Sequence, residues 1–383
     1  MSRINELIKE LCPNGVIYKK YGDVFEIKTG KGITTKEATD DGLYPIISGG
    51  TTPIGYYHSY HRDENIVTVS RVGANAGYVN FITEKFYLND KCFSIIPKDE
   101  FVKCFIPKYI YHYTKNIENK IMELQSEGGV PTINTQKVSN LLMPMLPIDV
   151  QLEIITVLDK FGELEAELEA ELEARKNQYE FWRGKIINMY DSKNIKLSDM
   201  AKIYDGTHST PNYQENGIPF ISVENISNIY GTNKFISKED YKKYKIKPEI
   251  NDVFMTRIGT IGKCSVFEKQ IDLAYYVSLA LIRPNTEIIL PKYLKYVIES
   301  NIGKDELYKR TLVHAVPIKV NKDEIGKIVL PVPSIDDQKK IISKLDKFES
   351  LTESNSSGLP AEIELRRQQY EYYRNKLLNF EVL

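Results

Sequence analysis

The stretch Leu164-Glu-Ala-Glu-Leu168-Glu-Ala-Glu-Leu172-Glu-Ala-Arg175 repeats a four-residue unit, and it decides how this 383-residue chain is organised. Every residue in it is a strong helix former, and neither Gly nor Pro occurs between Glu163 and Arg183. The sequence therefore predicts a long helix within Gln151–Tyr190. A helix of about 35 residues is roughly 50 Å long. This length exceeds that of a typical globular helix and indicates a spacer or an interaction rod.

Apolar side chains along this helix follow the spacing of a coiled-coil seam. They recur at alternating intervals of four and three residues, with Glu165 and Arg175 as polar interruptions. The predicted seam consists of Ile154, Leu158, Phe161, Leu168, Leu172, Tyr179, Trp182, Ile186 and Met189. Such a stripe is buried by packing against a partner helix.

The entry and the exit of this helix each occur twice in the chain, which indicates an internal duplication. Pro144–Gln151 and Pro331–Gln338 share an Ile-Asp-x-Gln segment, and Gln178-Tyr-Glu-Phe-Trp-Arg183 matches Gln369-Tyr-Glu-Tyr-Tyr-Arg374. The segments between these motifs match more weakly. The chain therefore reads as globule, long helix, globule, long helix, and the unlike globules suggest two modules with different targets.

The duplication predicts an α+β fold with two globular domains of irregular β structure and helices, separated by two long helices. The second helix carries seam residues at Leu345, Tyr370, Tyr373 and Leu377, and Ser354–Pro360 is expected to interrupt it. We expect the two helices to pair as an antiparallel intramolecular coiled coil. The predicted parts are 1–145 with a short N-terminal helix at Ile4–Leu11, 146–192 as central helix, 193–332, and 333–383 as distal helix with its break near 354–360.

No catalytic centre emerges from the sequence. Gly259-Thr-Ile-Gly262-Lys263 resembles part of a phosphate-binding loop, but Arg257 and Cys264 stand where that loop needs Gly and Ser or Thr. The four Cys show no metal-ligand spacing, and among the five His only His58 and His61 do, on a Tyr-rich turn where a surface role is favoured over metal binding. The sequence thus predicts no catalytic residue, no metal site and no cofactor. The net charge of −1 neither favours nor excludes nucleic acid. No apolar run is long enough for a membrane span.

Glycine-bearing loops with basic and small polar residues remain as candidate binding elements. Short side chains let the backbone approach a DNA groove, and Arg or Lys can then reach phosphates or guanine edges. Arg71 and Arg257 occur in matching strand–turn contexts, Val69–Gly73 and Met255–Gly259. The candidate DNA-binding residues are Lys28, Lys31, Ser48, Ser70, Arg71, Asn75, Lys202, Thr207, His208, Thr256, Arg257 and Lys263.

The globule–helix duplication, the two helix-entry motifs and the two Gln-Tyr-Glu exits together resemble the DNA-specificity subunit of type I restriction-modification systems. The resemblance implies a non-catalytic subunit in which each globule reads half of a split DNA site. It further implies that the helices set the spacing and dock two methyltransferase subunits, which restriction subunits then join. S-adenosylmethionine, ATP and Mg²⁺ would belong to those partners, and the location would be the cytoplasm of a bacterium or archaeon.

Two other interpretations stay open on the sequence alone. The chain could be the specificity partner of a combined type II nuclease–methyltransferase that cuts on both sides of its site. It could also be a coiled-coil scaffold without a nucleic-acid role. The bases of either half-site do not follow from residue order, because they depend on loop geometry and DNA shape.

Overall fold

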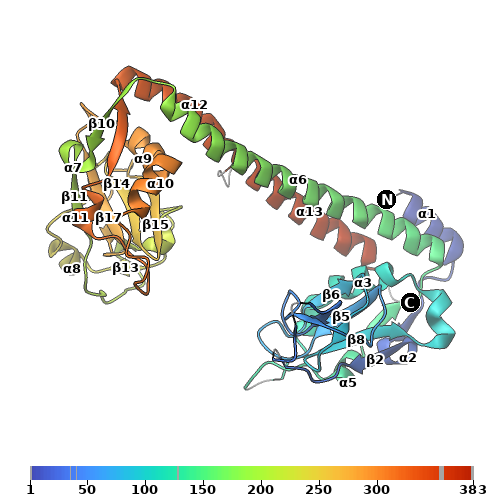
Figure 1. Ribbon diagram of the computed structural model, residues 1–383. Helices are drawn as coiled ribbons and strands as arrows, with labels where there is room; N and C mark the ends of the chain where they lie inside the picture. Colours follow the sequence, from blue (N-terminus) through green and yellow to red (C-terminus); the bar gives the residue numbers. More distant parts are fainter. Residues whose placement is uncertain (1, 35, 40, 127–128, 353–357, 381–383) are drawn as a thin grey trace. The chain divides into compact units, whose positions relative to one another are not determined.

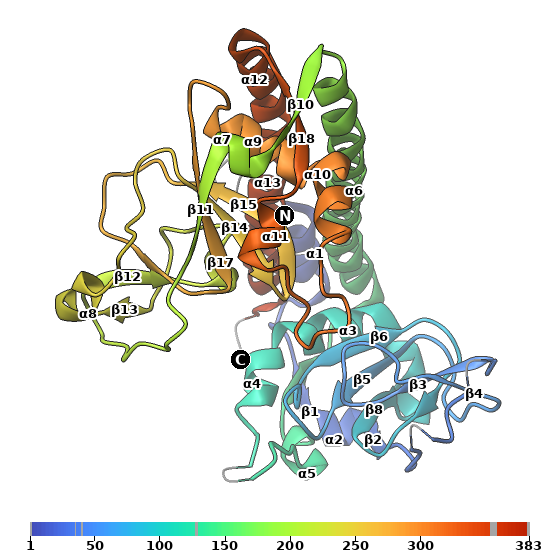
Figure 2. The ribbon, with the colours of Figure 1, turned by 60° about the vertical axis from the view of Figure 1, so that its left-hand side comes forward.

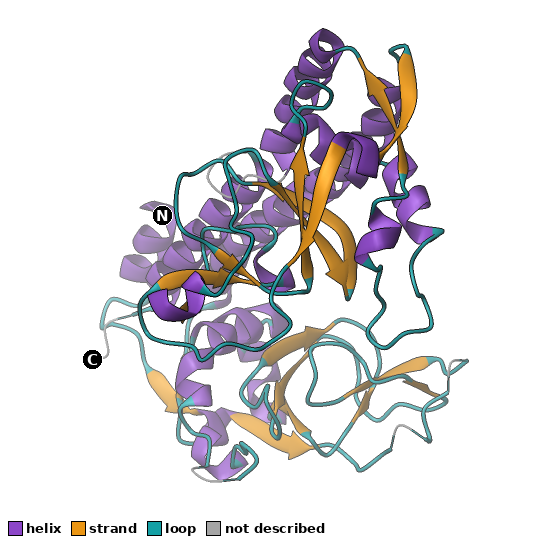
Figure 3. Cartoon of the chain, turned by 90° about the vertical axis from the view of Figure 1, so that its left-hand side faces the viewer, coloured by secondary structure: helices purple, strands orange, loops and turns teal. Residues whose placement is uncertain are grey.

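The computed structural model describes residues 2–34, 36–39, 41–126, 129–352 and 358–380. The chain forms two compact units: unit 1 comprises Met1–Leu168 and Ile363–Leu383, and unit 2 comprises Glu169–Glu362. Helices and strands are mixed in both (Figure 3), so the predicted α+β class is confirmed.

Unit 1 starts with a short helix and continues as short strands with helical turns between them. Its strands are β1 (Tyr18–Lys20), β2 (Phe25–Thr29), β3 (Tyr44–Ile47), β4 (Tyr56–Tyr57), β5 (Ile66–Ser70), β6 (Val79–Ile82), β7 (Tyr87–Leu88), β8 (Cys92–Pro97) and β9 (Leu142–Pro144). Its short helices are α1 (Ser2–Leu11), α2 (Tyr21–Val24), the 3₁₀ helix η1 (Asp99–Cys104), α3 (Pro107–Asn116), α4 (Glu118–Met122) and α5 (Thr135–Val138).

Unit 2 repeats the order of the nine strands, with some differences in the short helices between them. Its strands are β10 (Ser192–Lys196), β11 (Ala201–Asp205), β12 (Ile218–Ile221), β13 (Phe235–Ile236), β14 (Val253–Ile258), β15 (Thr260–Val266), β16 (Ala274–Tyr275), β17 (Leu279–Pro284) and β18 (Val329–Pro333). Its short helices are α7 (Leu197–Met200), the 3₁₀ helix η2 (Val223–Asn225), α8 (Lys238–Lys242), α9 (Pro291–Glu299), α10 (Asn301–Tyr308) and α11 (Lys322–Ile325).

The two units share one sheet topology. A four-stranded antiparallel sheet has the order β2-β8-β5-β6 in unit 1 and β11-β17-β14-β15 in unit 2. A three-stranded sheet, β4-β3-β7 or β13-β12-β16, contains one parallel pair in each unit. α3 packs against β5 and β6, and α9 packs against β14 and β15 (Figure 2). The duplication seen in the sequence is therefore a duplication of fold.

Local sequence signals explain where several elements begin. Pro107 and Pro291 occupy the first turn of α3 and α9, where a missing backbone N–H costs no hydrogen bond. The helical turn α2 separates β1 from β2. This turn buries Tyr21 and Val24, three residues apart, on one face.

The long helices pair antiparallel, as the sequence predicts. α6 (Ile148–Asn188) is a single helix of 41 residues. In unit 1, α13 (Leu359–Leu378) runs along its first half (Figure 1), with Phe161 stacked on Tyr373 and Glu165 paired with Arg367. In unit 2, α12 (Ile335–Thr352) packs along its second half, with Tyr179 stacked on Phe348. Of the predicted break near 354–360, residues 354–357 lie outside the described residues.

The buried stripe of α6 differs from the predicted seam after Tyr179. Trp182 is 39% exposed and Met189 is 67% exposed, whereas Arg183 and Ile187 are buried. The four-then-three spacing continues from Tyr179 to Arg183 and Ile186, and Trp182 lies about 100° around the helix from Arg183. The prediction of Trp182 and Met189 as seam residues was wrong because it favoured apolar residues over a buried, ion-paired arginine.

A buried glutamine ties the start of α6 to unit 1. Gln151 is fully buried. Its Oε1 accepts a hydrogen bond from the Ile106 N–H at 2.9 Å. Its Nε2 donates to the carbonyl oxygens of Cys104 and Leu146, both at 2.8 Å. One side chain thus satisfies three backbone groups that would otherwise be buried without partners.

Gln338 does the same at the start of α12 in unit 2. Its Oε1 accepts from the Leu290 N–H at 2.8 Å, and its Nε2 donates to the carbonyl oxygens of Ile288 at 2.9 Å and Pro333 at 3.0 Å. The recurrence of Gln in both helix-entry motifs therefore has a structural cause. Sequence comparison within the chain found the residue but not this role.

A second attachment joins each long helix to the short helix that follows the sheet. In unit 1, Asp159 on α6 accepts from Lys108 at 2.6 Å and lies 3.1 Å from Nε2 of His112. Burial lowers the pKa of His112, although Asp159 acts in the opposite direction. In unit 2, Asp346 on α12 pairs with Lys292 and accepts from the Tyr296 hydroxyl at 2.5 Å.

Each unit has its own apolar core. The core of unit 1 includes Ile4 of α1, Leu158 of α6 and Leu377 of α13. The N-terminal helix and the end of the distal helix therefore share one buried cluster. The main core of unit 2 includes Tyr179 of α6 and Leu345 of α12. Described residues between Leu158 and Tyr179 are absent from both buried clusters.

Candidate nucleic-acid interface

One end of the large sheet gathers most of the candidate residues of unit 1. β2 and β5 both end here, and Gly73 follows β5 with a φ of 103°. A side chain added at Gly73 would meet open space, so this turn projects from the surface. The Gly73 N–H donates to the Pro131 carbonyl at 3.0 Å, and the Ile133 N–H donates to the backbone carbonyl of Arg71 at 2.8 Å.

The same backbone arrangement recurs in unit 2. Gly259 follows β14 with a φ of 80° and again faces open space. Its N–H donates to the Ile318 carbonyl at 2.8 Å, and the Val320 N–H donates to the backbone carbonyl of Arg257 at 3.0 Å. Each unit therefore presents a glycine turn beside a second loop at the same place in the fold.

The candidate residues differ widely in exposure. In unit 1, Lys28, Lys31 and Asn75 are exposed, Arg71 is half-buried, and Ser48 and Ser70 are buried. In unit 2, Lys202, His208 and Lys263 are exposed, Thr207 is half-buried, and Thr256 and Arg257 are buried. Of the buried residues, Ser70, Thr256 and Arg257 belong to strands β5 and β14, and Ser48 directly follows β3. The loop assignment from sequence did not resolve this.

Several candidates already have partners within their own unit. Lys28 pairs with Glu26 on the same strand. The side-chain amide of Asn75 donates to the Gly49 carbonyl at 3.3 Å. Thr256 accepts a hydrogen bond from the Lys263 N–H at 3.0 Å. Thr256 therefore fixes the β14–β15 hairpin that carries Lys263 at its surface.

The two matching arginines have different surroundings. The guanidinium of Arg257 forms an ion pair with Asp205 at the end of β11. Arg71 forms no ion pair with any described carboxylate, and its buried Nε has no hydrogen-bond partner there. Arg71 lies close to Cys92; burial raises the pKa of that thiol to about 11, against the opposing effect of the Arg71 cation.

A cleft of about 680 Å³ opens beside the sheet end of unit 2. Asp205, Thr207, Asp240, Lys243 and Tyr244 contribute to its wall. These groups supply both hydrogen-bond donors and acceptors, which suits contact with polar edges of a ligand such as DNA bases.

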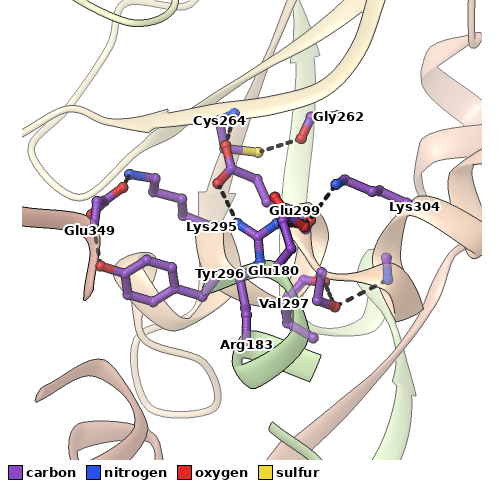
Figure 4. Close-up of polar contacts among 12 residues, drawn as sticks. Glu180, Arg183, Gly262, Cys264, Lys295, Tyr296, Val297, Glu299, Lys304 and Glu349 are labelled. Atoms are coloured by element: carbon purple, nitrogen blue, oxygen red, sulfur yellow. Dashed lines mark hydrogen bonds and ion pairs between the residues drawn. The ribbon is translucent and has the colours of Figure 1, made fainter. Parts of the chain in front are cut away.

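A buried polar network connects α6 to the hairpin of unit 2 (Figure 4). Arg183 donates from Nη2 to the Glu299 carbonyl at 2.7 Å and lies 3.5 Å from the Glu299 carboxylate. That carboxylate also accepts from the Cys264 N–H of β15 at 2.9 Å. Burial raises the pKa of Glu299, and the nearby lysine and arginine cations oppose this. The sequence analysis missed both Arg183 and Glu299, although Arg183 recurs as Arg374 in the duplicated exit motif.

An aromatic pair occurs on α6 and on α13; both rings are exposed on α6, whereas only Tyr372 is exposed on α13. On α6, Phe181 and Trp182 meet edge to face with ring centroids 5.6 Å apart, and the Lys185 ammonium lies 4.4 Å from the Phe181 ring. On α13, Tyr372 and Tyr373 meet in the same way at 5.3 Å.

The remaining predicted helix residues serve the contact between helices. Leu158, Tyr179, Leu345 and Leu377 are buried, and Leu168, Leu172, Tyr370 and Tyr373 are half-buried. Trp182, by contrast, is 39% exposed and therefore accessible to a partner protein.

Neither a metal site nor a membrane span occurs among the described residues. No cluster of three or more His, Cys, Asp or Glu side chains there is arranged to hold a metal ion. None of the helices formed by these residues is long and apolar enough to cross a membrane.

A family model for the type I restriction modification DNA specificity domain matches residues 13–174 and 189–365. The chain belongs to this family. The two matches cover the globular part of each unit together with adjoining long-helix sequence. The chain is therefore a type I restriction-modification specificity subunit with two DNA specificity domains, as its resemblance to the family predicted.

Relatives of this family match nearly the whole chain. A type I restriction enzyme specificity subunit of Escherichia coli is 27% identical over 99% of this chain and 98% of its own length. A putative type I specificity subunit of Haemophilus influenzae is 28% identical over 85% of both chains.

Solved structures support the same fold. A type I restriction-modification S subunit from M. genitalium superposes with a TM-score of 0.53 over 95% of this chain and 96% of its own, at 17% identity. A structure that addresses complex assembly and conformational transition of the type I system gives a TM-score of 0.63 over 96% and 98%, at 15% identity.

Proposed function

We propose that each unit reads one half of a split DNA sequence and that the long helices set the spacing between the halves. The observation that carries this proposal is the duplicated sheet end. Both units place a glycine turn and an arginine at the same position, yet the surrounding side chains differ. A shared scaffold with different side chains suits two readers of unlike half-sites.

The proposal assigns the direct DNA contacts to exposed side chains at these sheet ends. They are Lys28, Lys31 and Asn75 in unit 1, and His208 and Lys263 in unit 2, with Thr207 and the cleft beside it. The remaining candidate, Lys202, is exposed but lies near the start of β11, paired with Arg283, away from this end of the sheet. The buried Ser48, Ser70 and Thr256 support the strands that carry these contacts. Cations here would neutralise phosphates, and the polar groups would contact base edges.

The proposal assigns spacing to the Leu-Glu-Ala-Glu repeat. One repeat unit lengthens a helix by roughly 6 Å, which corresponds to one or two base-pair steps of about 3.4 Å each. Most repeat side chains are exposed, and the buried cores include none of them. The helix length can therefore change without altering either core.

The exposed aromatic side chains Phe181 and Trp182 on α6, and Tyr372 on α13, mark the proposed docking sites for two methyltransferase subunits, one on each helix. Aromatic side chains with an adjacent cation commonly dominate binding energy at protein interfaces. Restriction subunits would join the resulting complex. The subunit itself would supply no catalysis, and S-adenosylmethionine, ATP and Mg²⁺ would act in its partners, in the cytoplasm.

Co-expression with the methyltransferase subunit of the same system, followed by methylome sequencing, tests this function. The expected result is adenine N6 methylation within one bipartite sequence that has a fixed gap. Exchanging residues 193–332 for the matching segment of a relative should change one half of that sequence only. Methylation of a continuous site, or a change in both halves, would contradict the assignment of one half-site to each unit.

A further inference from the structure

Strand register identifies equivalent positions at the two sheet ends. In unit 1, Thr29 of β2 pairs with Phe93 of β8, which pairs with Val69 of β5. Arg71 lies two residues beyond Val69. Thr29, Phe93 and Val69 thus lie side by side across three strands, and together with Arg71 they form what we call the corner of the sheet.

Unit 2 has the same row. Asp205 of β11 pairs with Ala280 of β17, which pairs with Met255 of β14. Arg257 lies two residues beyond Met255. Thr29 and Asp205 are therefore equivalent, as are Arg71 and Arg257, and the carboxylate that pairs with Arg257 has no counterpart in unit 1.

Two further pairs of positions follow from backbone contacts. The Arg71 N–H donates to the Lys91 carbonyl at 2.7 Å, and the Arg257 N–H donates to the Ser278 carbonyl at 3.0 Å. Lys91 and Ser278 are thus equivalent.

Lys31 and Thr207 are equivalent in the same sense. Each forms an isolated parallel bridge to the residue that follows a short strand of the smaller sheet. Lys31 bridges to Asn89 after β7, and Thr207 bridges to Tyr276 after β16. Each also follows a glycine on which a Cβ would collide with the backbone of that strand.

The four equivalent positions differ in charge. Unit 1 has Thr29, Lys31, Arg71 and Lys91, whereas unit 2 has Asp205, Thr207, Arg257 and Ser278. Lys31 and Lys91 are exposed. The exposed carboxylate of Asp90 lies next to Lys91, so the corner of unit 1 keeps a net charge of +2. In unit 2 the single cation is paired with the single acid.

Resting on the proposed function, we propose that the two units hold DNA by different chemistry at this corner. Lys31, Arg71 and Lys91 of unit 1 contact DNA phosphates. Arg257 of unit 2 does not contact DNA but holds Asp205 at the wall of the cleft. If Arg257 turned to bind a DNA phosphate, the Asp205 carboxylate would lose its ion-pair partner and would lie close to the negatively charged phosphate. At this corner, unit 1 therefore contributes more salt-dependent affinity than unit 2.

Salt dependence of DNA binding by the complex with the methyltransferase subunit tests this. The probe is a duplex with the bipartite sequence that methylome sequencing identifies. Each lost phosphate contact reduces the slope of log affinity against log salt concentration by about 0.9. Lys31→Ala/Arg71→Gln/Lys91→Ala should therefore reduce the slope by about 2.7. Lys31→Ala/Lys91→Ala changes only exposed side chains and should reduce it by about 1.8.

Two variants serve as controls. Asp205→Ala/Arg257→Ala removes the neutral pair of unit 2, and Lys120→Ala removes an exposed lysine of α4; neither should change the slope. The inference is overturned if the unit 1 variants leave the slope unchanged, or if Asp205→Ala/Arg257→Ala reduces it as much as they do. If the wild-type complex does not bind the duplex that it methylates, the proposed function fails instead, and this inference fails with it.

Discussion

Replacing Gln338 by Leu tests how the long helix is joined to unit 2. The buried amide forms one acceptor and two donor hydrogen bonds to backbone groups, at 2.8–3.0 Å. Leu has a similar volume but forms none of these bonds, so three buried backbone groups lose their partners. At about 1–3 kcal/mol for each unsatisfied group, the substitution should lower the free energy of unfolding of unit 2 by at least about 3 kcal/mol.

Hydrogen exchange measured by mass spectrometry locates this effect. A loss of 3 kcal/mol should accelerate hydrogen exchange by about 100-fold for amides that exchange through unfolding of unit 2. These include the Leu290 N–H, which donates to Gln338 in the wild-type protein. The Ile106 amide in unit 1 should keep its protection. Gln151→Leu should give the reverse pattern, because the glutamines belong to separate cores.

Gln178→Leu is the matched control, since Gln178 is an exposed glutamine of α6. It should change the free energy of unfolding by less than about 0.5 kcal/mol. Unchanged protection of Leu290 in Gln338→Leu, or equal loss of protection in both units, would refute the view that each glutamine joins one helix to one globule.

Three further predictions concern the helices. Deleting Leu168–Glu171 should shorten the gap in the methylated sequence by one or two base pairs while both half-sites stay the same, and methylome sequencing that finds an unchanged gap would contradict the spacing role. Trp182→Ala should weaken binding of the methyltransferase subunit by about 30-fold or more in calorimetry, whereas Tyr308→Ala, which removes another exposed aromatic side chain, should not. His112 has a lowered pKa in the folded protein, so the unfolded chain binds its proton more readily. Stability of unit 1 should therefore decrease as pH falls below about 6.5, by at most about 1.4 kcal/mol per pH unit. Chemical denaturation of His112→Gln should lack this component, and an identical pH profile for both proteins would rule it out.

The long helix and the duplication could be predicted because both depend on local pattern. Repeated Leu, Glu and Ala have strong helix propensity, and two copies of an entry motif can be recognised without knowing what the motif does. The motif's glutamine acts on Ile106, Cys104 and Leu146, and two of these precede it by more than 40 residues. Its role therefore required the tertiary structure.

The candidate site was predictable only in outline. The glycine turns and the two arginines were found because they recur, but recurrence does not report the partner of a side chain. The pairing of Arg257 with Asp205 depends on strand order, with β17 between β11 and β14. In the same way, the burial of Arg183 rather than Trp182 depends on Glu299, which approaches α6 from another helix.

The four-residue length of the repeat in α6 also has a consequence for orientation. Each residue turns an α-helix by about 100°, so a four-residue unit adds one full turn and about 40° more. Gain or loss of a unit therefore rotates everything beyond it about the helix axis, as well as moving it along. B-DNA turns by about 35° per base pair, so the groove that faces a reader also rotates when the gap changes. Whether a new repeat number yields a working enzyme depends on how well these two rotations agree, and not on length alone.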